Sequence, residues 1–344
     1  MDWEDKMRTI NDTVRIRHTE VKNRMVMPPM VCFNWGDTLG FETVDRAYHY
    51  GLRAKGDTGL IVIEATSISP SGRITESELG LWDDAHINQF KKIADACHAH
   101  GSKVIVQLVH AGSKSIQPFH GSSSENFSLE DIQNDFISAS LRAEKAGLDG
   151  VEIHGAHGYL LNQLTSLETN MRTDQYGGTL DNRLKLSVDI VKMLRDLTND
   201  DFIIGYRYGV NDPSFKEDII MAKALENAGV DFMNVSAGIG FKTLEAPISF
   251  PFSPITYMGV FLQEHLSIPC ACVFGIRAAE QADWLIKNTS IAMIAVGKGL
   301  LSDPDWTHKA IYNEKIDPCL DCAGGCKFRY DGRECPWALR HNRF

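Results

Sequence analysis

The chain has 344 residues, of which 43% are hydrophobic, and it carries a formal net charge of −10. This composition is typical of a globular protein with a large core, and the negative charge argues against nucleic acid or an anionic membrane as the main partner. Charged residues near the N-terminus, among them Asp2, Glu4 and Lys6, interrupt any signal-like apolar stretch. No run approaches the roughly 20 apolar residues that span a bilayer. We therefore expect a soluble, cytoplasmic protein whose partners are small molecules, with homo-oligomer formation left open.

Short runs rich in β-branched residues alternate along the chain with stretches of helical period. The predicted strands are Asn23–Met27, Gly59–Glu64, Lys103–Leu108, Gly150–His154, Phe202–Arg207, Asp231–Val235, Cys270–Phe274 and Ala292–Val296. The predicted helices are Val44–Lys55, Ile87–His100, Leu129–Ala146, Asp181–Leu197, Glu217–Ala228, Thr256–His265 and Ala278–Lys287. Eight such units favour an α/β fold of the (β/α)₈ TIM-barrel type over an open doubly wound sheet, since no G-x-G-x-x-G opens a helix after a strand. We expect a single-domain barrel over residues 1–310 and a short cysteine-containing extension over residues 311–344.

The first three predicted strands end in residues that suit a flat heterocycle. The first is followed by the stiff apolar turn Pro28-Pro29-Met30-Val31, which could wall an aromatic cofactor or merely turn the chain. The second ends at Glu64-Ala65, where the small Ala65 leaves room for a planar ring. The third ends with Gln107, whose amide can both donate and accept hydrogen bonds at a ring edge.

The fourth predicted strand opens into His154-Gly155-Ala156-His157-Gly158-Tyr159. Two imidazoles at the end of a strand suit binding of a carbonyl oxygen or an anion, and a nearby tyrosine could deliver a proton. Two other readings stay open. The histidines could satisfy local backbone groups, or they could bind a metal, although the nearest carboxylate, Glu152, should alternate away from the neighbouring apolar side chains.

The later strands end in cationic and glycine-rich segments. Arg207 ends the fifth strand, and a buried arginine needs an anionic partner, either a ligand or a strand-end carboxylate such as Glu64. The seventh strand leads into Gly275 and the eighth into Gly297-Lys298, which is the usual phosphate-binding position of such barrels. These parts together predict a barrel mouth for a phosphorylated redox cofactor with a substrate stacked on it.

Several segments that span nearly the whole chain carry a family resemblance. They are NRMVMPPM (23–30), VQLVHAG (106–112), VEIHGAHGYL (151–160), NMRTDQYGGTLDNR (170–183) and VGKGLLSDPDW (296–306). In this order they resemble the old yellow enzyme family of FMN-dependent NAD(P)H oxidoreductases, in its bacterial type. The resemblance implies FMN as cofactor, NAD(P)H as reductant, and hydride transfer from reduced FMN to activated C=C bonds of α,β-unsaturated carbonyl-type substrates.

The resemblance also implies roles for individual residues. The cofactor-binding residues would be Pro28, Pro29, Met30, Val31, Ala65, Gln107, Arg207, Gly238, Gly275, Gly297 and Lys298. His154 and His157 would bind the substrate's carbonyl oxygen, and Tyr159 would give a proton to its α-carbon. Phe33 would contact the substrate.

The chain departs from the family pattern at the cofactor and in its tail. Val31 stands where threonine or cysteine often tunes flavin O4, and Lys298 stands where arginine is common, which keeps the charge but loses the bidentate fork. Phe33 replaces a frequent tyrosine and cannot donate a hydrogen bond. The tail carries four cysteines, Cys319, Cys322, Cys326 and Cys335.

The four tail cysteines resemble the iron–sulfur segment of larger family members such as 2,4-dienoyl-CoA reductase. Thiolates at these spacings could hold a [4Fe–4S] cluster or zinc, or could stay as free thiols. Two alternatives from other functional classes also stay open: a flavin-binding electron-transfer or regulatory protein, and a metal-dependent TIM-barrel hydrolase.

Overall fold

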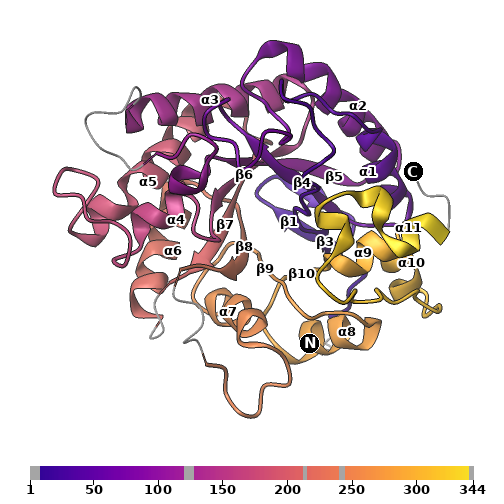
Figure 1. Ribbon diagram of the computed structural model, residues 1–344. Coiled ribbons are helices and arrows are strands. Elements are labelled where there is room, and N and C mark those ends of the chain that lie inside the picture. The colour runs from indigo at the N-terminus through magenta and orange to yellow at the C-terminus, as the bar shows by residue number, and fades with distance from the viewer. Residues whose placement is uncertain (1–7, 120–127, 212–214, 240–244, 341–344) are drawn as a thin grey trace.

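A closed barrel of parallel strands forms the centre of the protein. The structure, a computed structural model, describes residues 8–119, 128–211, 215–239 and 245–340. The strands pair in the closed order β10-β3-β4-β5-β6-β7-β8-β9 (Figure 1). Their bounds are β3 (Met25–Met27), β4 (Leu60–Ser67), β5 (Lys103–Val109), β6 (Gly150–Gly155), β7 (Ile203–Val210), β8 (Phe232–Ala237), β9 (Cys270–Cys272) and β10 (Met293–Ala295). The predicted (β/α)₈ TIM barrel and its eight strands are confirmed.

Helices surround the barrel in the order in which they were predicted. Their bounds are α1 (Arg46–Lys55), α2 (Ile87–His98), α3 (Leu129–Lys145), α5 (Leu180–Leu197), α6 (Lys216–Ala228), α7 (Pro254–Gln263) and α8 (Ala279–Asn288). Ser128 caps α3 in a reciprocal pair with Asp131, which is the arrangement of a capping box. No helix within the described ranges combines the length and the apolar character that a membrane crossing requires.

Several short helices were not predicted from the sequence. They are α4 (Leu160–Thr165), α9 (Lys298–Ser302), α10 (Trp306–Ile311) and α11 (Pro336–Arg340). Of these, α4 begins directly after the His154–Tyr159 segment. A helix of six residues is too short to show the 3.6-residue period on which the prediction rested.

Side-chain alternation along the strands gives the barrel an apolar floor and a polar layer above it. An interior cluster contains Val62, Ile105, Ile203 and Phe232. Further along the same wall, Gln107 and Asn234 both donate to the buried carboxylate of Glu152. Since the side chain of every second residue faces the barrel axis, these polar residues lie between the apolar floor and the strands' carboxyl ends.

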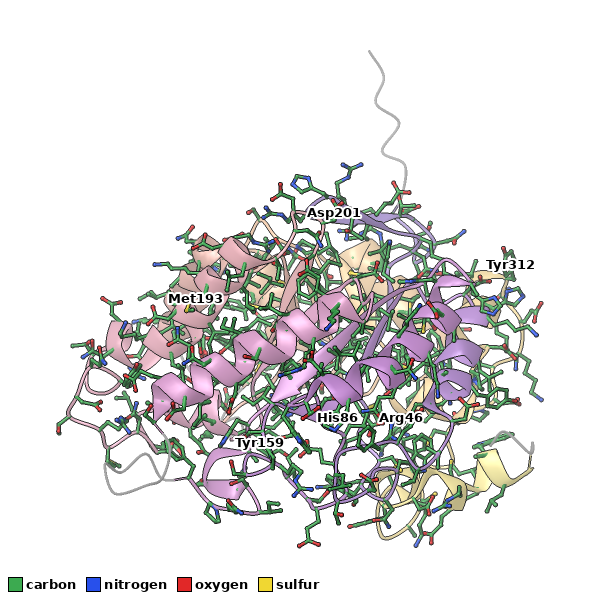
Figure 2. All side chains as sticks on the ribbon, turned by 90° about the horizontal axis from the view of Figure 1, so that it is seen from above. Arg46, His86, Tyr159, Met193, Asp201 and Tyr312 are labelled. Atoms are coloured by element: carbon green, nitrogen blue, oxygen red, sulfur yellow. The ribbon has the colours of Figure 1, made fainter. Side chains whose placement is uncertain are left out.

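The two ends of the barrel are covered by different segments of the chain. In the side view of Figure 2, Tyr159 and the C-terminal tail lie at one end, and Asp201 lies at the other. The hairpin of β1 (Val14–Ile16) and β2 (Thr19–Val21) packs its apolar residues against the floor cluster. No sequence signal had predicted this hairpin.

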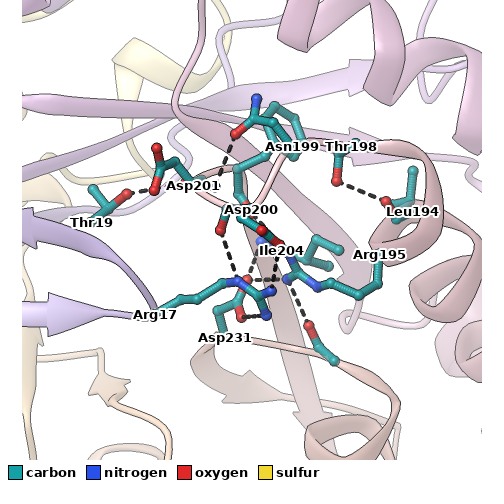
Figure 3. A network of polar contacts seen from close by, with 12 residues as sticks. Arg17, Thr19, Leu194, Arg195, Thr198, Asn199, Asp200, Asp201, Ile204 and Asp231 are labelled. Carbon is teal, nitrogen blue, oxygen red and sulfur yellow. Dashed lines mark hydrogen bonds and ion pairs between the residues drawn. The ribbon is translucent and has the colours of Figure 1, made fainter.

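Polar contacts fasten the hairpin in place (Figure 3). Arg17 pairs with Asp200 at 3.2 Å and with Asp231 at 3.7 Å. The Thr19 hydroxyl donates to the Asp201 carbonyl at 3.1 Å. The hairpin thereby covers the amino-terminal end of the barrel, opposite the mouth that carries the predicted site residues.

The C-terminal tail folds back onto the loop that follows β3. The Phe33 N–H donates to the Arg329 carbonyl at 3.0 Å, and the Asn34 N–H donates to the Tyr330 carbonyl at 3.1 Å. The Gly332 N–H lies 3.1 Å from the Cys32 sulfur. The tail, yellow in Figure 1, is therefore part of the wall around the mouth.

Candidate active site

A cavity of about 360 Å³ opens at the carboxyl ends of β3, β9 and β10. Seven residues that were predicted to bind the cofactor line it: Pro28, Pro29, Met30, Arg207, Gly275, Gly297 and Lys298. Further lining residues that the prediction missed include Phe274, Arg277, Trp306, Asp317 and Cys319. The structure thus brings the turn after the first barrel strand to the glycine loops after the seventh and eighth.

Arg207 is the most distinctive group in this cavity. It is 5% exposed, and its Nε and Nη1 atoms are buried with no hydrogen-bond partner among the described residues. The alternative of an ion pair between Arg207 and Glu64 was wrong, because Glu64 accepts from Arg46 Nε at 2.8 Å. Two buried donors without partners are costly, so this arginine fits an electron-rich or anionic ligand.

Beside Arg207 lies the buried Glu152. Gln107 Nε2 donates to Glu152 Oε1 at 2.7 Å, and Asn234 Nδ2 donates to Oε2 at 2.8 Å. Burial raises the pKa of Glu152, and the Arg207 charge opposes that rise. One amide N–H of Gln107 is thus committed to Glu152, and Gln107 is placed in the layer directly beneath the mouth.

The two glycine loops form the cationic side of the cavity. A Cβ on Gly297 would lie 2.8 Å from Met30 Sδ, so the loop passes close to the turn after β3 and a larger residue would require the Met30 side chain to move. Lys298 Nζ lies 2.8 Å and Arg277 Nη2 lies 3.0 Å from the two carboxylate oxygens of Asp321. Asp321 lies between Cys319 and Cys322 in the tail. Nothing in the cysteine motif had indicated that it supplies an ion-pair partner for Lys298, the predicted phosphate-binding residue.

Phe274 adds a strained aromatic residue to the same loop. It has a φ of +89°, which is unfavourable for a bulky residue, and its side chain is 58% exposed. The Phe274 carbonyl accepts from the Thr256 hydroxyl at 2.8 Å. The loop is thus held in a conformation that leaves the ring at the rim of the cavity.

The two histidines lie together at the end of β6. Their ring centroids are 5.0 Å apart and nearly perpendicular. The Ala156 N–H points at His154 Nδ1 at 3.2 Å, so a neutral His154 carries its proton on Nε2. That atom lies 3.3 Å from His157 Nδ1, and His157 Nε2 lies 2.9 Å from the Ser236 hydroxyl.

Both histidines are kept neutral by their surroundings. Burial lowers the pKa of His154 well below its usual value, and the neighbouring His157 and Arg207 add to the effect, since either one, when charged, repels a second positive charge. Burial also lowers the pKa of His157, to about 3, followed by the charges of Arg207 and Lys114, although His157 as a residue is more exposed than His154. Neutral imidazoles donate one N–H each, which suits an uncharged carbonyl oxygen.

Tyr159 completes the predicted group. Its ring centroid lies 5.1 Å from that of His154, at 88°, and Lys114 Nζ lies 5.5 Å from the ring. Burial raises the pKa of the phenol, so Tyr159 is protonated at neutral pH and can serve as a proton donor.

The remaining predicted residues lie around the same mouth, outside the lining of the cavity. Ala65 is buried at the end of β4, and Gly238 follows β8. The Cys32 N–H donates to Glu64 Oε2 at 3.0 Å, which fixes the turn that carries Val31 and Phe33.

The four tail cysteines lie next to this site. All are free, and they line a second cavity of about 20 Å³ together with Lys298. Cys319 and Lys298 line both cavities. Within the described parts of the chain, no group of three or more His, Cys, Asp or Glu side chains is arranged to hold a metal ion.

Comparison with known proteins gives a consistent family match. The sequence model of the NADH:flavin oxidoreductase / NADH oxidase family matches residues 12–316. The NADPH dehydrogenase of Listeria innocua is 32% identical over 314 residues, which cover 86% of this chain and 92% of that protein. The NADH oxidase of Thermoanaerobacter brockii is 32% identical over 341 residues, and the chain spans about half, 52%, of its length.

Solved structures share the fold. The old yellow enzyme homologue from Zymomonas mobilis superimposes with a TM-score of 0.78 at 22% identity, covering 94% of this chain and 96% of that one. A 2-naphthoyl-CoA reductase in complex with 2-naphthoyl-CoA gives a TM-score of 0.80 at 24% identity, covering 93% of this chain and 55% of that one.

Proposed function

Because the chain belongs to the NADH:flavin oxidoreductase / NADH oxidase family, we propose that it reduces activated C=C bonds of α,β-unsaturated carbonyl compounds. It is an oxidoreductase of the old yellow enzyme type, with FMN as its cofactor and NAD(P)H as its reductant. The observation that carries the proposal is the cavity in which unpartnered Arg207 donors face a cationic glycine loop.

The residues of the cavity fit FMN. The buried Nε and Nη1 atoms of Arg207 suit the electron-rich edge of an isoalloxazine, and Gly297 with Lys298 suits a phosphate. Pro28, Pro29 and Met30 would form the apolar wall. When bound, FMN accepts hydride from NAD(P)H and delivers hydride to the substrate.

The substrate side would be built by His154, His157 and Tyr159. Each neutral imidazole can donate one N–H to the carbonyl oxygen, which withdraws electrons from the alkene. The His157 ring would exchange its contact with Ser236, 2.9 Å away, for the substrate. The Tyr159 phenol would then hold the proton that the α-carbon receives.

The test is the double variant His154→Ala/His157→Ala. Loss of oxyanion-type donors typically slows a reaction by about 10²–10³-fold, so cyclohexenone reduction should fall by that order while FMN reduction by NAD(P)H changes much less. Stopped-flow measurement of the two half-reactions separates these effects. The matched control is His308→Ala, since His308 lies on α10 and pairs with Asp57 at 2.7 Å.

Two results would contradict the proposal. Unchanged enone reduction in the double variant would assign the histidines to local structure. A colourless protein that takes up no FMN in a titration would remove the basis of the cavity assignment.

A second candidate function is electron transfer between the cofactor site and the cysteine segment. The observation in its favour is that Cys319 and Lys298 line both cavities. The visible spectrum of the anaerobically purified protein, together with its iron content, tests this candidate. Flavin bands alone, without iron, would count against it.

A further inference from the structure

Arg329 is a cation without a counter-charge beside the proposed substrate site. Its side chain is exposed and forms no ion pair or hydrogen bond with any residue that the structure describes. The guanidinium carbon lies 5.3 Å from the centroid of the Phe33 ring. The Arg329 carbonyl accepts from the Phe33 N–H at 3.0 Å, so the backbone fixes this arginine above the residue expected to contact the substrate.

A second cation faces the same place from another part of the chain. Lys114 Nζ donates to the His157 carbonyl at 2.9 Å and lies 5.5 Å from the Tyr159 ring. Arg329 acts on the same phenol: burial is the largest influence on the pKa of Tyr159 and raises it, whereas the Arg329 charge lowers it. Both cations therefore lie within electrostatic reach of the proposed proton donor.

The acidic group that acts on Tyr159 does not neutralise them. Glu78, which also influences Tyr159, is 3% exposed, and its Oε1 has no hydrogen-bond partner among the described residues. Burial raises its pKa well above the ordinary value, so it tends toward the uncharged form. The cations at the predicted phosphate site differ from these two, because Lys298 and Arg277 both form ion pairs with Asp321.

We propose that Arg329, with Lys114, binds a carboxylate of the substrate, so that the enzyme prefers α,β-unsaturated carbonyl compounds that carry a carboxylate. This inference rests on the proposed ene reduction. The planar guanidinium matches a carboxylate in two parallel hydrogen bonds. Because Arg329 lies over Phe33, the residue expected to contact the substrate, we place the carboxylate on the substrate and not on the cofactor. Arg329 is thus a specificity-determining residue supplied by the cysteine-rich tail.

The experiment compares an acid with its ester in the FMN-loaded enzyme. The substrates are 4-oxo-4-phenylbut-2-enoate and its methyl ester. Arg329→Gln should lower kcat/KM for the acid roughly tenfold, mainly through KM, because one charge-assisted contact is lost. The kcat/KM for the ester should change less than about twofold. Added salt should lower kcat/KM for the acid only, because it screens the charge pair. Arg329→Lys should restore part of the loss.

Two controls keep the result specific. Lys192→Gln removes the same formal charge from the exposed face of α5 and should leave the acid-to-ester ratio unchanged. Binding without turnover is followed by titrating the oxidised holoenzyme with 4-oxo-4-phenylbutanoate and its methyl ester and recording the flavin absorbance. Only the saturated acid should bind more weakly to Arg329→Gln.

The contrary outcomes are distinct. Equal losses for acid and ester, or none for either, would overturn the carboxylate site. A changed preference between NADPH and NADH with an unchanged acid-to-ester ratio would assign Arg329 to the reductant instead. If the unaltered enzyme reduces neither compound, the proposed ene reduction fails, and the absorbance titration still decides the carboxylate site.

Discussion

At the scale of single residues, buried arginines in this protein differ in whether a carboxylate pairs with them. Arg46 pairs with Glu64 at 2.8 Å, and Arg183 pairs with Glu217 at 2.9 Å. Arg207 is about as buried but has no carboxylate partner, and two of its donor atoms lack hydrogen-bond partners within the described chain, against one each in Arg46 and Arg183. The paired arginines stabilise the fold, whereas Arg207 keeps its hydrogen-bonding capacity for a ligand.

Arg207→Met should lower the midpoint potential of bound FMN. Loss of a charge-assisted contact to reduced flavin costs about 1.5–3 kcal/mol, or about 30–60 mV for a two-electron couple. Anaerobic spectroelectrochemistry measures the change. Arg46→Met is the comparison, since breaking a buried ion pair should lower the free energy of unfolding by about 3–5 kcal/mol without the shift in potential. An unaltered potential in folded Arg207→Met would assign the arginine to structure.

Tyr159→Phe should slow the half-reaction with enones by about 10²–10⁴-fold, the usual contribution of a positioned proton donor. The half-reaction with NAD(P)H should change little, because it needs no proton from Tyr159. Rapid-mixing kinetics of both half-reactions gives the comparison. Tyr176→Phe is the matched control, since its hydroxyl donates to Glu130 at 3.0 Å. Equal small effects on both half-reactions would mean that Tyr159 only packs against α4.

At the scale of elements, the site depends on segments that are far apart in the sequence. The loops after β9 and β10 supply Arg277 and Lys298, and the tail supplies Asp321, which bridges them. The hydrogen bond from Lys298, followed by that from Arg277, lowers the pKa of Asp321, and the charges of both add to the effect. The carboxylate is therefore ionised and would compete with the phosphate of the proposed cofactor for the same two cations.

Asp321→Asn should strengthen binding of FMN several-fold, because the two cations lose a competing anion. Riboflavin lacks the phosphate, so its affinity should not change. Fluorescence titration of the apoprotein with both flavins measures the difference. Asp331→Asn provides the same substitution elsewhere in the tail, where Asp331 pairs with Arg333. Weaker FMN binding in Asp321→Asn would show instead that the bridge orders the cations for the phosphate.

At the scale of the whole molecule, buried neutral histidines link stability to pH. Burial lowers the pKa of His110 to about 4 and that of His154 well below its usual value. Below pH 6.5 the unfolded chain binds protons that the folded chain does not, so stability is lost as pH falls. Glu78 and Glu152 act in the opposite sense, since their raised pKa values cost stability as pH rises from about 4.5.

Replacing His110 with glutamine should flatten the loss of stability between pH 6.5 and 4. A pKa lowered from 6.5 to about 4 corresponds to about 3 kcal/mol across that interval. Urea denaturation at a series of pH values measures the slope. His308→Gln should leave the slope in that interval unchanged and alter the pH dependence only above pH 6.5, because the contact with Asp57 raises the pKa of His308 and its contribution is lost as pH rises. An unchanged slope in His110→Gln would show that other groups control the acid sensitivity.

The sequence by itself determined the barrel and the end of it that carries the site. Period-2 strands, 3.6-residue helices and caps such as Ser128 are local signals, and each is legible without knowledge of the partner element. In a parallel barrel all strands end at one mouth. Because each of them lies at the end of a strand, the sequence was enough to predict that Pro28, Arg207, Gly275 and Lys298 lie close together. The catalytic roles of His154, His157 and Tyr159 stay predictions.

Only the tertiary structure decided which side chains pair. Whether Glu64 meets Arg46 or Arg207 depends on how α1, which begins at Arg46, packs against β4, which carries Glu64. The hairpin on the barrel floor, the Asp321 bridge and the placement of Arg329 on Phe33 join segments that are distant in the sequence. Such contacts have no periodic signature, because they are formed by packing between elements and not by the conformation of any one of them.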